Sequence, residues 1–225
     1  MKQQKLEPMA QFFNSRAEVY DEVHTSHIDG GRASKDIVAG LLPEGTKRIL
    51  DLGVGTGLEL EAVFARFPEA HVTGIDMAED MLQKLRERFL GEASPGDASP
   101  GREMELLCGS YLETDFGTAQ YDAVISVMSL HHLLPVQKRL LFEQVRRCLV
   151  PGGVFLNCDY YAKFKVQELR FRAQLRAMHV PSGSVHFDIP LTARHEMNIM
   201  RSSGFCYVKD AWKQGNTWVL EAKVD

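Results

Sequence analysis

Three glycines alternate with other residues in the segment 51–57, D-L-G-V-G-T-G. Glycine has no Cβ, so a backbone with this spacing turns tightly and lets a ligand approach its amide groups. The apolar run 47–52 before it is typical of a buried strand, and residues 58–67 are typical of a helix. Open α/β sheets bind ligands at the carboxyl ends of their strands, so the segment predicts a binding site.

The glycine spacing discriminates between classes of nucleotide site. The dinucleotide pattern G-x-G-x-x-G fails, because Leu58 occupies its sixth position. A phosphate-cradling P-loop fails as well, because no lysine stands in a G-x-x-x-x-G-K-[ST] frame. A carboxylate, Asp76, ends the next apolar run, 71–76. Its two acceptor oxygens suit two neighbouring hydroxyl donors.

Further polar and aromatic side chains follow later strands. His131 and His132 come after the apolar run 121–127, and a histidine there is able to take a proton near neutral pH. Packing and hydrogen bonding alone would explain the pair more simply. Residues 159–161, D-Y-Y, end another strand and would border a second substrate, or else one tyrosine belongs to the core.

Strands and helices alternate along most of the chain. Apolar periodicity predicts helices at 10–24, 33–42, 58–67, 77–90, 136–149, 162–179 and 191–202. It predicts strands at 47–52, 71–76, 103–108, 121–127, 153–158, 205–212 and 217–224. Such alternation indicates a parallel sheet covered on both faces, with a terminal antiparallel hairpin. The segment 91–101 repeats A-S-P-G and predicts a surface loop, with a lid as the alternative.

Taken together, these motifs resemble those of the class I S-adenosylmethionine (SAM)-dependent methyltransferases. D-L-G-V-G-T-G (51–57) resembles their first motif, and Y-D-A-V-I-S-V-M-S-L-H-H-L (121–133) resembles their fourth-strand motif. L-V-P-G-G-V-F (149–155) resembles the segment that leads into their fifth strand. F-F-N-S-R-A-E-V-Y-D (12–21) resembles the helix that closes over SAM, so the resemblance covers nearly the whole chain.

The resemblance implies one domain over residues 1–225, with a Rossmann-like fold of three layers, α-β-α. Its seven-stranded sheet would have the order 3-2-1-4-5-7-6, with strand 7 antiparallel. Residues 1–45 would form a helical cover and residues 46–160 the SAM-binding core. Residues 161–225 would supply the acceptor-side helix and the terminal hairpin.

The resemblance also implies SAM as cofactor and S-adenosylhomocysteine as product. Gly53 and Gly55 would face the methionine part, Asp51 would organise the loop and the amino group, Asp76 would hold the ribose, and Met77 would pack on adenine. The full set of expected cofactor contacts is Tyr20, Asp51, Gly53, Gly55, Thr56, Asp76, Met77, Met81, Ser110, Tyr111 and Ser126.

Two of these positions carry an open question. Relatives commonly place Gly-Asp after the third strand, where this chain has Gly109-Ser110. A serine oxygen accepts a hydrogen bond from the adenine amino group more weakly than a carboxylate does. Tyr20 either caps the methionine end of SAM or is a buried helix aromatic.

Methyl transfer from a sulfonium is an in-line displacement in which orientation supplies much of the acceleration. A base is needed only where the acceptor loses a proton, and His131 is the expected base, ahead of His132. We expect no metal site, and the four cysteines contain no C-x-x-C pair. Cys108 and Cys158, at strand ends, are expected to be small apolar residues.

Charge favours a small-molecule acceptor over nucleic acid. Lys and Arg number 26 against 30 Asp and Glu, a net charge of −4, whereas nucleic-acid-binding proteins are usually basic. One basic run, 163–176, keeps an RNA base, such as a tRNA base, as an alternative, although a solvated helix face explains it more simply. We expect helix 162–179 to cover the acceptor pocket.

The same motifs are compatible with a SAM-modifying enzyme that resembles carboxy-SAM synthase, and with a SAM-binding module without catalysis. A nicotinamide-dependent oxidoreductase is disfavoured by the glycine spacing, and a homodimer is left open. No apolar run of about 18 residues occurs, and residues 1–10 have no apolar signal segment, which predicts a cytoplasmic protein without a membrane segment.

Overall fold

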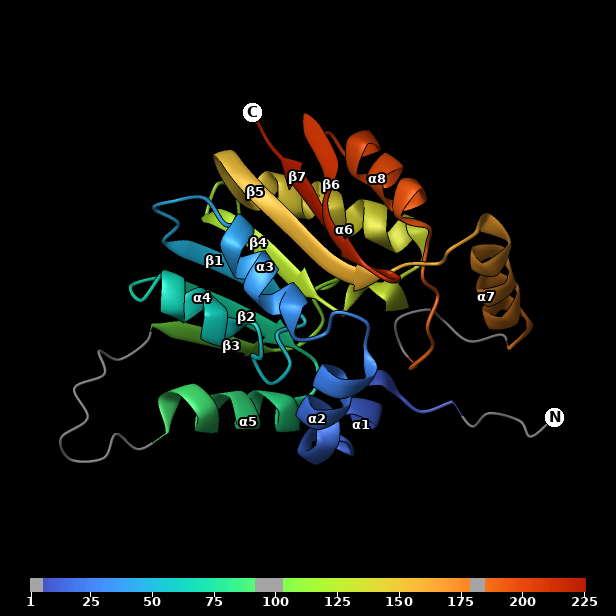
Figure 1. Ribbon diagram of the computed structural model, residues 1–225, viewed down its shortest axis with the longest axis horizontal. Coiled ribbons are helices and arrows are strands. Elements are labelled where there is room, and N and C mark those ends of the chain that lie inside the picture. The colour runs from blue at the N-terminus through green and yellow to red at the C-terminus, as the bar shows by residue number, and fades with distance from the viewer. Residues whose placement is uncertain (1–5, 92–102, 179–184) are drawn as a thin grey trace.

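A seven-stranded sheet forms the centre of the computed structural model, which describes residues 6–91, 103–178 and 185–225 (Figure 1). In chain order the strands are β1 (Arg48–Leu52), β2 (His71–Asp76), β3 (Met104–Cys108), β4 (Tyr121–Val127), β5 (Leu149–Tyr160), β6 (Tyr207–Gln214) and β7 (Thr217–Lys223). In space their order is β3-β2-β1-β4-β5-β7-β6. β7 pairs antiparallel with both of its neighbours, and the other pairs are parallel. The predicted order and the antiparallel seventh strand are confirmed.

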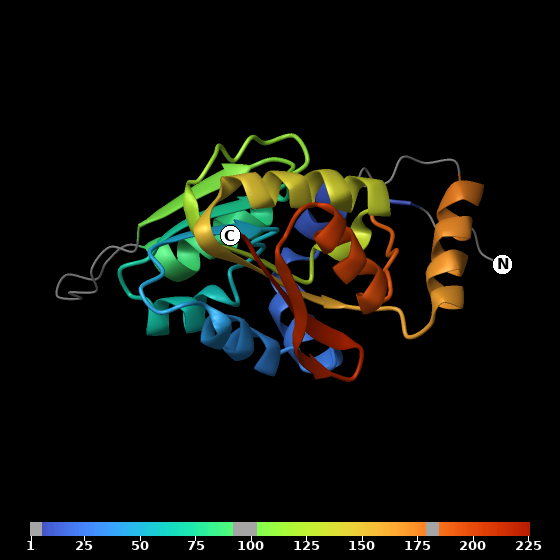
Figure 2. The ribbon, with the colours of Figure 1, turned by 90° about the horizontal axis from the view of Figure 1, so that it is seen from above.

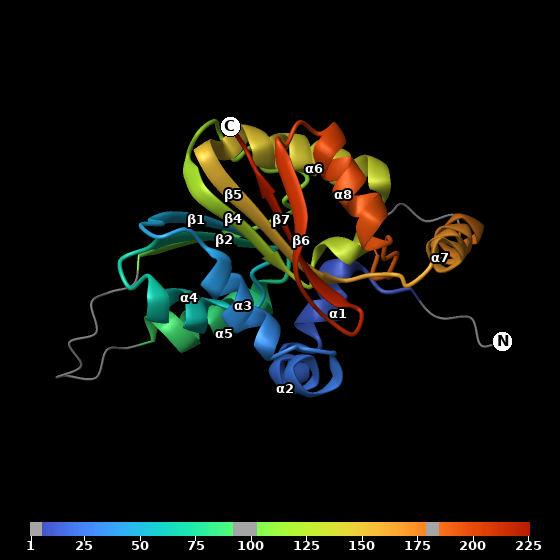
Figure 3. The same cartoon turned by 45° about the horizontal axis from the view of Figure 1, so that its top comes forward.

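Helices cover both faces of the sheet, because successive strand side chains point to opposite sides. On β1, Ile49 packs into one apolar core, whereas Leu50 and Leu52 pack into the other. One face is covered by α3 (Ala33–Leu41), α4 (Leu60–Arg66) and α5 (Glu79–Leu90), and the other by α6 (Pro135–Cys148) and α8 (Ala193–Ser202). Figure 3 shows these two layers below and above the sheet, so the three-layer Rossmann-like architecture is confirmed.

The N-terminal segment forms two short helices in place of the single helix predicted for 10–24. α1 (Met9–Asn14) and α2 (Ala17–His27) are separated at Ser15 and Arg16. The Ser15 hydroxyl donates to the carbonyl of Phe12, three residues back, and the backbone of Arg16 leaves the helical region with φ −117°. Hydrogen bonding of serine to nearby backbone competes with helix continuation, which accounts for the break.

The two N-terminal helices are tied to the glycine segment and to α5. The Thr56 hydroxyl donates to Asp21 Oδ1 of α2 at 2.6 Å. Arg88 of α5 donates to the Thr56 carbonyl at 3.0 Å and also pairs with Asp21. These contacts hold α2 beside the carboxyl end of β1, where the predicted helical cover was expected.

Helix α7 (Lys165–Ala177) lies away from α1 and α2, at the periphery of the molecule (Figure 2). Its apolar side chains Phe164 and Leu169 are 66% and 52% exposed. In the described part of the chain, no residue of α7 lines either of the two cavities of the candidate site, so the expectation that this helix covers the acceptor pocket is wrong. The turn expected at 181–184 and nearly all of the predicted loop 91–101 lie outside the described residues.

None of the helices in the described ranges is both long and apolar enough to cross a membrane.

Candidate active site

The glycine segment turns sharply at the carboxyl end of β1. Gly53 has φ +77° and Gly55 has φ +52°, a region that L side chains rarely adopt. The Gly53 amide donates to the Ile75 carbonyl of β2 at 2.8 Å. A Cβ added to Gly53 would lie 2.1 Å from the Ser129 hydroxyl oxygen. Glycine is therefore required at position 53 by both conformation and space.

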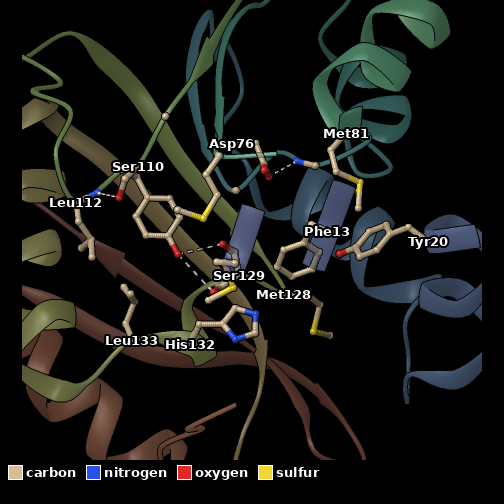
Figure 4. A pocket seen from close by; sticks show the side chains of 16 residues that line it. Phe13, Tyr20, Asp76, Met81, Ser110, Leu112, Met128, Ser129, His132 and Leu133 are labelled. Carbon is tan, nitrogen blue, oxygen red and sulfur yellow. Dashed lines mark hydrogen bonds between the residues drawn. The ribbon is translucent and has the colours of Figure 1, made fainter. Parts of the chain in front are cut away.

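A cavity opens beside this turn, at the carboxyl ends of β1, β2, β3 and β4, and we call it the glycine-loop cavity. It encloses about 650 Å³, including its open mouth. Figure 4 shows the ring of Phe13 beside that of Tyr20 on one wall, and Ser110 and Leu112 on another. Its lining residues are Met9, Phe13, Tyr20, Gly53, Gly55, Asp76, Met77, Met81, Gly109, Ser110, Tyr111, Leu112, Met128, Ser129, His132 and Leu133.

The Asp76 carboxylate is fixed in the wall of the glycine-loop cavity. Its Oδ2 accepts a hydrogen bond from the Gly55 amide at 3.0 Å (Figure 4). Its Oδ1 accepts one from the Ala78 amide at 2.8 Å. Burial raises the pKa of Asp76 to about 6, although these hydrogen bonds oppose the shift. Each carboxylate oxygen has a second lone pair, so both remain able to accept from a ligand hydroxyl.

Most residues that the sequence predicted for cofactor contact meet in this wall. Asp51, Thr56 and Ser126 do not line the cavity. Ser126 donates to the Leu52 carbonyl at 2.8 Å and so links β4 to β1, while Thr56 binds Asp21. The predicted residues that do line it are Tyr20, Gly53, Gly55, Asp76, Met77, Met81, Ser110 and Tyr111.

Buried polar groups without partners lie next to the glycine segment. The carboxyl groups of Asp51 and Glu59 are hydrogen-bonded to each other when one of them is protonated. Nζ of Lys35 and Nδ1 of His24 have no hydrogen-bond partner among the described residues. Burial and the charge of Glu59 raise the pKa of Asp51 well above its usual range, and burial lowers the pKa of Lys35. Unpaired buried polar groups are costly, so this cluster favours a polar ligand or water at this place.

Several lining residues had no signal of their own in the sequence. Met9 belongs to no recognised motif, whereas Phe13 lies in the segment that resembles the SAM-closing helix. Met128 and Ser129 lie in the segment 121–133 that resembles the fourth-strand motif and directly follow β4, although the sequence did not single them out as contacts. Met128 has φ +53°, which is unusual for a residue other than glycine and is found most often at functional sites.

A second cavity of about 1100 Å³, including its open mouth, adjoins the first, and we call it the histidine cavity. Phe13, Tyr20, Met128 and His132 line both cavities. Much of its wall is apolar, and three of its histidines, His131, His132 and His186, cluster around Asp188; this cluster is its polar end. The complete lining is Phe12, Phe13, Arg16, Val19, Tyr20, Val23, His24, Ile28, Met128, His131, His132, Tyr160, His186 and Asp188.

His131, the predicted base, lies in a short 3₁₀ helix, η1 (Leu130–His132), and is bound to a buried carboxylate. Its Nδ1 is 2.7 Å from Asp159 Oδ1, and its ring stacks against Tyr160 with centroids 4.3 Å apart. Burial alone would lower the pKa of His131, but the charge and hydrogen bond of Asp159 raise it above its ordinary value. With Nδ1 engaged by Asp159, Nε2 is the nitrogen that can meet a ligand in the histidine cavity.

His132 differs from its neighbour in charge state. Burial and the charge of His131 lower its pKa to about 4, so it is neutral near pH 7. Asp188, which no sequence pattern singled out, lies 3.3 Å from His132 Nδ1 and 3.7 Å from His131 Nε2. Asp188 comes from the segment before α8, 56 residues beyond His132, and only the fold brings them together.

The remaining candidate groups do not enter the cavities. Tyr161 is buried, and its hydroxyl accepts a hydrogen bond from Asn157. Burial raises the pKa of Cys158 to about 12, which keeps this thiol protonated. In the basic run, Lys165 pairs with Glu168 at 2.5 Å, which removes part of the positive charge offered to a nucleic acid.

Comparison with known proteins agrees with this geometry. A family model described as "Methyltransferase domain" matches residues 49–153, which run from β1 into β5. The trans-aconitate 2-methyltransferase of Rhodopseudomonas palustris (strain BisA53) is 38% identical over 183 residues, covering 74% of this chain and 65% of that protein. The O-methyltransferase cnsE of Penicillium expansum is 25% identical over 182 residues, covering 80% of this chain and 60% of that protein.

A solved structure supports the same fold. The putative O-methyltransferase of Nostoc punctiforme PCC 73102 superposes with a TM-score of 0.70 at 20% identity, covering 96% of this chain and 62% of that one. The chain thus spans 60%, 65% and 62% of the lengths of these three proteins.

Proposed function

The chain belongs to the class I SAM-dependent methyltransferases, and from this premise we propose that it transfers a methyl group from SAM to a small-molecule acceptor. The observation that carries the proposal is the shared wall of the two cavities. Phe13, Tyr20, Met128 and His132 line both, so a cofactor in one has direct access to a molecule in the other.

The residues around the glycine-loop cavity fit SAM. Asp76 offers two carboxylate oxygens for the ribose hydroxyls, and Met77, Ser110 and Leu112 lie on the wall where adenine would pack. Asp51 does not line this cavity, so it would act on the charged amino-acid end only indirectly, by organising the glycine segment. SAM supplies a methyl group already activated by its sulfonium.

The histidine cavity fits a small acceptor with an apolar body and one polar group. Phe12, Val19, Val23 and Ile28 supply apolar wall, and His131 supplies a polar end. The cavity is enclosed in part by α1 and α2, which leaves little room for a folded RNA. This match of shape and chemistry favours a small molecule over a nucleic acid.

We assign the base role to His131 for an acceptor that loses a proton. Asp159 holds Nδ1–H, which fixes the tautomer and leaves the lone pair of Nε2 to take the proton. His132, neutral and on the wall between the cavities, orients the acceptor. For an acceptor without a proton to lose, orientation by this wall suffices.

A binding and transfer experiment tests the proposal. Calorimetry should give 1:1 binding of SAM and of S-adenosylhomocysteine, and none of NAD. A screen with methyl-labelled SAM should then transfer label to a small molecule from a metabolite library. Tight NAD binding without SAM binding would contradict the family-based function. Labelling of total tRNA, with affinity that falls steeply as salt rises, would overturn the small-molecule acceptor.

A further inference from the structure

Three imidazole rings surround one carboxylate oxygen at the polar end of the histidine cavity. His131 Nε2, His132 Nδ1 and His186 Nε2 lie 3.7, 3.3 and 3.7 Å from Asp188 Oδ1. This oxygen is buried, and the His132 and Tyr160 side chains are hydrogen-bonded to the Asp188 carboxylate. Ligand atoms of His131, His132 and Asp188 all lie within 4.8 Å of one another.

These separations are close to those that a metal ion requires. Zn²⁺ binds histidine nitrogen and carboxylate oxygen at about 2.0–2.2 Å in a tetrahedral arrangement. Two ligand atoms at such distances are about 3.3–3.5 Å apart, by the geometry of a tetrahedron. The separations of 3.3 and 3.7 Å at Asp188 Oδ1 need to change by only a few tenths of an ångström. The ligand nitrogens of His131 and His132 lie within 4.8 Å of each other and need to come to about 3.3–3.5 Å.

Asp159 completes the arrangement from outside the cluster. Its carboxylate holds His131 Nδ1 at 2.7 Å, which directs Nε2 toward Asp188. Histidine ligands of metal ions almost always donate their second ring N–H to such a carboxylate or carbonyl, and this partner fixes the ring orientation. Asp159 is 1% exposed, so the pair is a built feature of the interior and not a surface contact.

We propose that His131, His132 and Asp188 form a binding site for a divalent transition-metal ion, with Zn²⁺ the best fit. Two histidines and one carboxylate with a position left for a further ligand are a frequent catalytic metal set. The remaining position faces the histidine cavity, which all three residues line. His186, at 3.7 Å from the same carboxylate oxygen, is the neighbour best placed to close the site when no acceptor is bound.

The chemical role of the ion rests on the proposed function, whereas its binding does not. An acceptor hydroxyl that replaces water on the ion loses its proton to solvent. The resulting oxygen attacks the methyl carbon, the carbon–sulfur bond breaks with its electron pair left on sulfur, and an O–CH₃ bond forms. In the ion-bound protein, His131 is a ligand, and the ion replaces it in activating the acceptor.

Calorimetric titration of ZnCl₂ into tag-free, chelator-treated protein tests the site directly. We expect one ion per chain with a Kd of about 1 μM or below. Asp188→Asn and His131→Asn should each weaken binding by about 100-fold or more, and Asp159→Asn by about 10- to 100-fold, the range known for such outer partners. His71→Asn, at the other end of β2 from Asp76, is the matched control and should bind Zn²⁺ like the unchanged protein.

SAM affinity and thermal unfolding of each variant separate this site from the fold and from the proposed function. Normal SAM binding with lost Zn²⁺ binding in Asp188→Asn supports the metal site. Absence of stoichiometric Zn²⁺ binding in a protein that binds SAM overturns the metal site and leaves the proposed function intact. Equal Zn²⁺ affinity in the unchanged protein, Asp188→Asn and His131→Asn overturns it as well.

Discussion

The glycine-loop cavity lies at the carboxyl ends of β1 to β4 and takes its key residues from motifs at those strand ends, whereas the polar groups of the histidine cavity come from segments far apart in the sequence. Gly53, Gly55 and Asp76 come from two short motifs whose places follow from the order of the strands. His131 and Asp188 meet only because the chain returns past α7 to the same edge of the sheet. Residues of the strand-end motifs would hold the cofactor, so substitutions elsewhere should affect its binding little. Side chains would hold the acceptor, so the preferred acceptor should change when those side chains change.

The largest expected effect comes from a substitution in the histidine cavity that leaves the glycine-loop cavity unchanged. His131→Asn should lower turnover by a factor of roughly 10² to 10⁴, because the group that activates the acceptor is lost. SAM affinity should stay nearly the same, since His131 does not line the glycine-loop cavity. Steady-state kinetics with the acceptor found by the labelling screen, together with SAM calorimetry, measures both. Unchanged turnover per folded molecule would leave orientation as the whole mechanism.

The converse substitution alters the glycine-loop cavity. Gly53→Ala forces a side chain into a positive-φ position and against Ser129, so one of the two must move. Such backbone strain costs about 1–3 kcal/mol, which corresponds to a loss of SAM affinity of roughly 5- to 150-fold. Gly152→Ala is the matched control, because Gly152 has φ +78° but open space around its Cβ. Equal SAM affinity in both variants would contradict the close packing at Gly53.

A smaller effect is expected in the pH dependence of ligand affinity, which tests the role of Asp76. The pKa of Asp76 is raised to about 6, so the carboxylate is charged above pH 6 and becomes protonated as the pH falls below it. Adenosine carries the ribose hydroxyls without the amino-acid end, and its affinity should fall about tenfold between pH 8 and pH 5. The same titration on Asp76→Asn should be nearly flat. A pH dependence that persists in this variant would assign the titration to another group.

The smallest effect concerns the contacts that hold α2 over the cavity. Arg88→Ala removes the pair with Asp21 and the hydrogen bond to the Thr56 carbonyl. Partly exposed ion pairs are worth about 0.2–1 kcal/mol, so SAM affinity should fall by a factor of a few at most. Stopped-flow release of SAM should show the loss as faster dissociation. Arg139→Ala, which loses an exposed pair with Glu143, serves as control.

The same contrast explains what the sequence could predict. The seven strands and the glycine turn follow from periodicity and from residue types with narrow backbone preferences, and the structure confirms the sheet order. The helix break at Ser15 depends on a hydrogen bond from one side chain to a backbone carbonyl, which apolar periodicity cannot predict. Leu175 of α7 is buried, but Val166 and Leu169 are 53% and 52% exposed. The place of α7 thus depends on how little of its apolar surface packs on the rest of the molecule, which its sequence does not show.

Asp188 and Thr56 illustrate the same limit within the site. Asp188 belongs to no motif in the sequence. It becomes a candidate site residue only because the fold places His131 and His132 beside it. Thr56 lies inside a recognised motif, yet its hydroxyl binds Asp21 and holds the helical cover. A motif thus predicts where a residue lies, but the partner of its side chain is decided by the rest of the fold.

The glycine-loop cavity and the histidine cavity are, in the proposed function, two halves of one site. A crystal structure with S-adenosylhomocysteine bound tests this claim most directly. We expect the ribose hydroxyls at Asp76, adenine beside Met77 and Ser110, and the sulfur beside Met128 and His132, where the cavities meet. A cofactor seated in the histidine cavity, or a sulfur facing away from it, would contradict the claim.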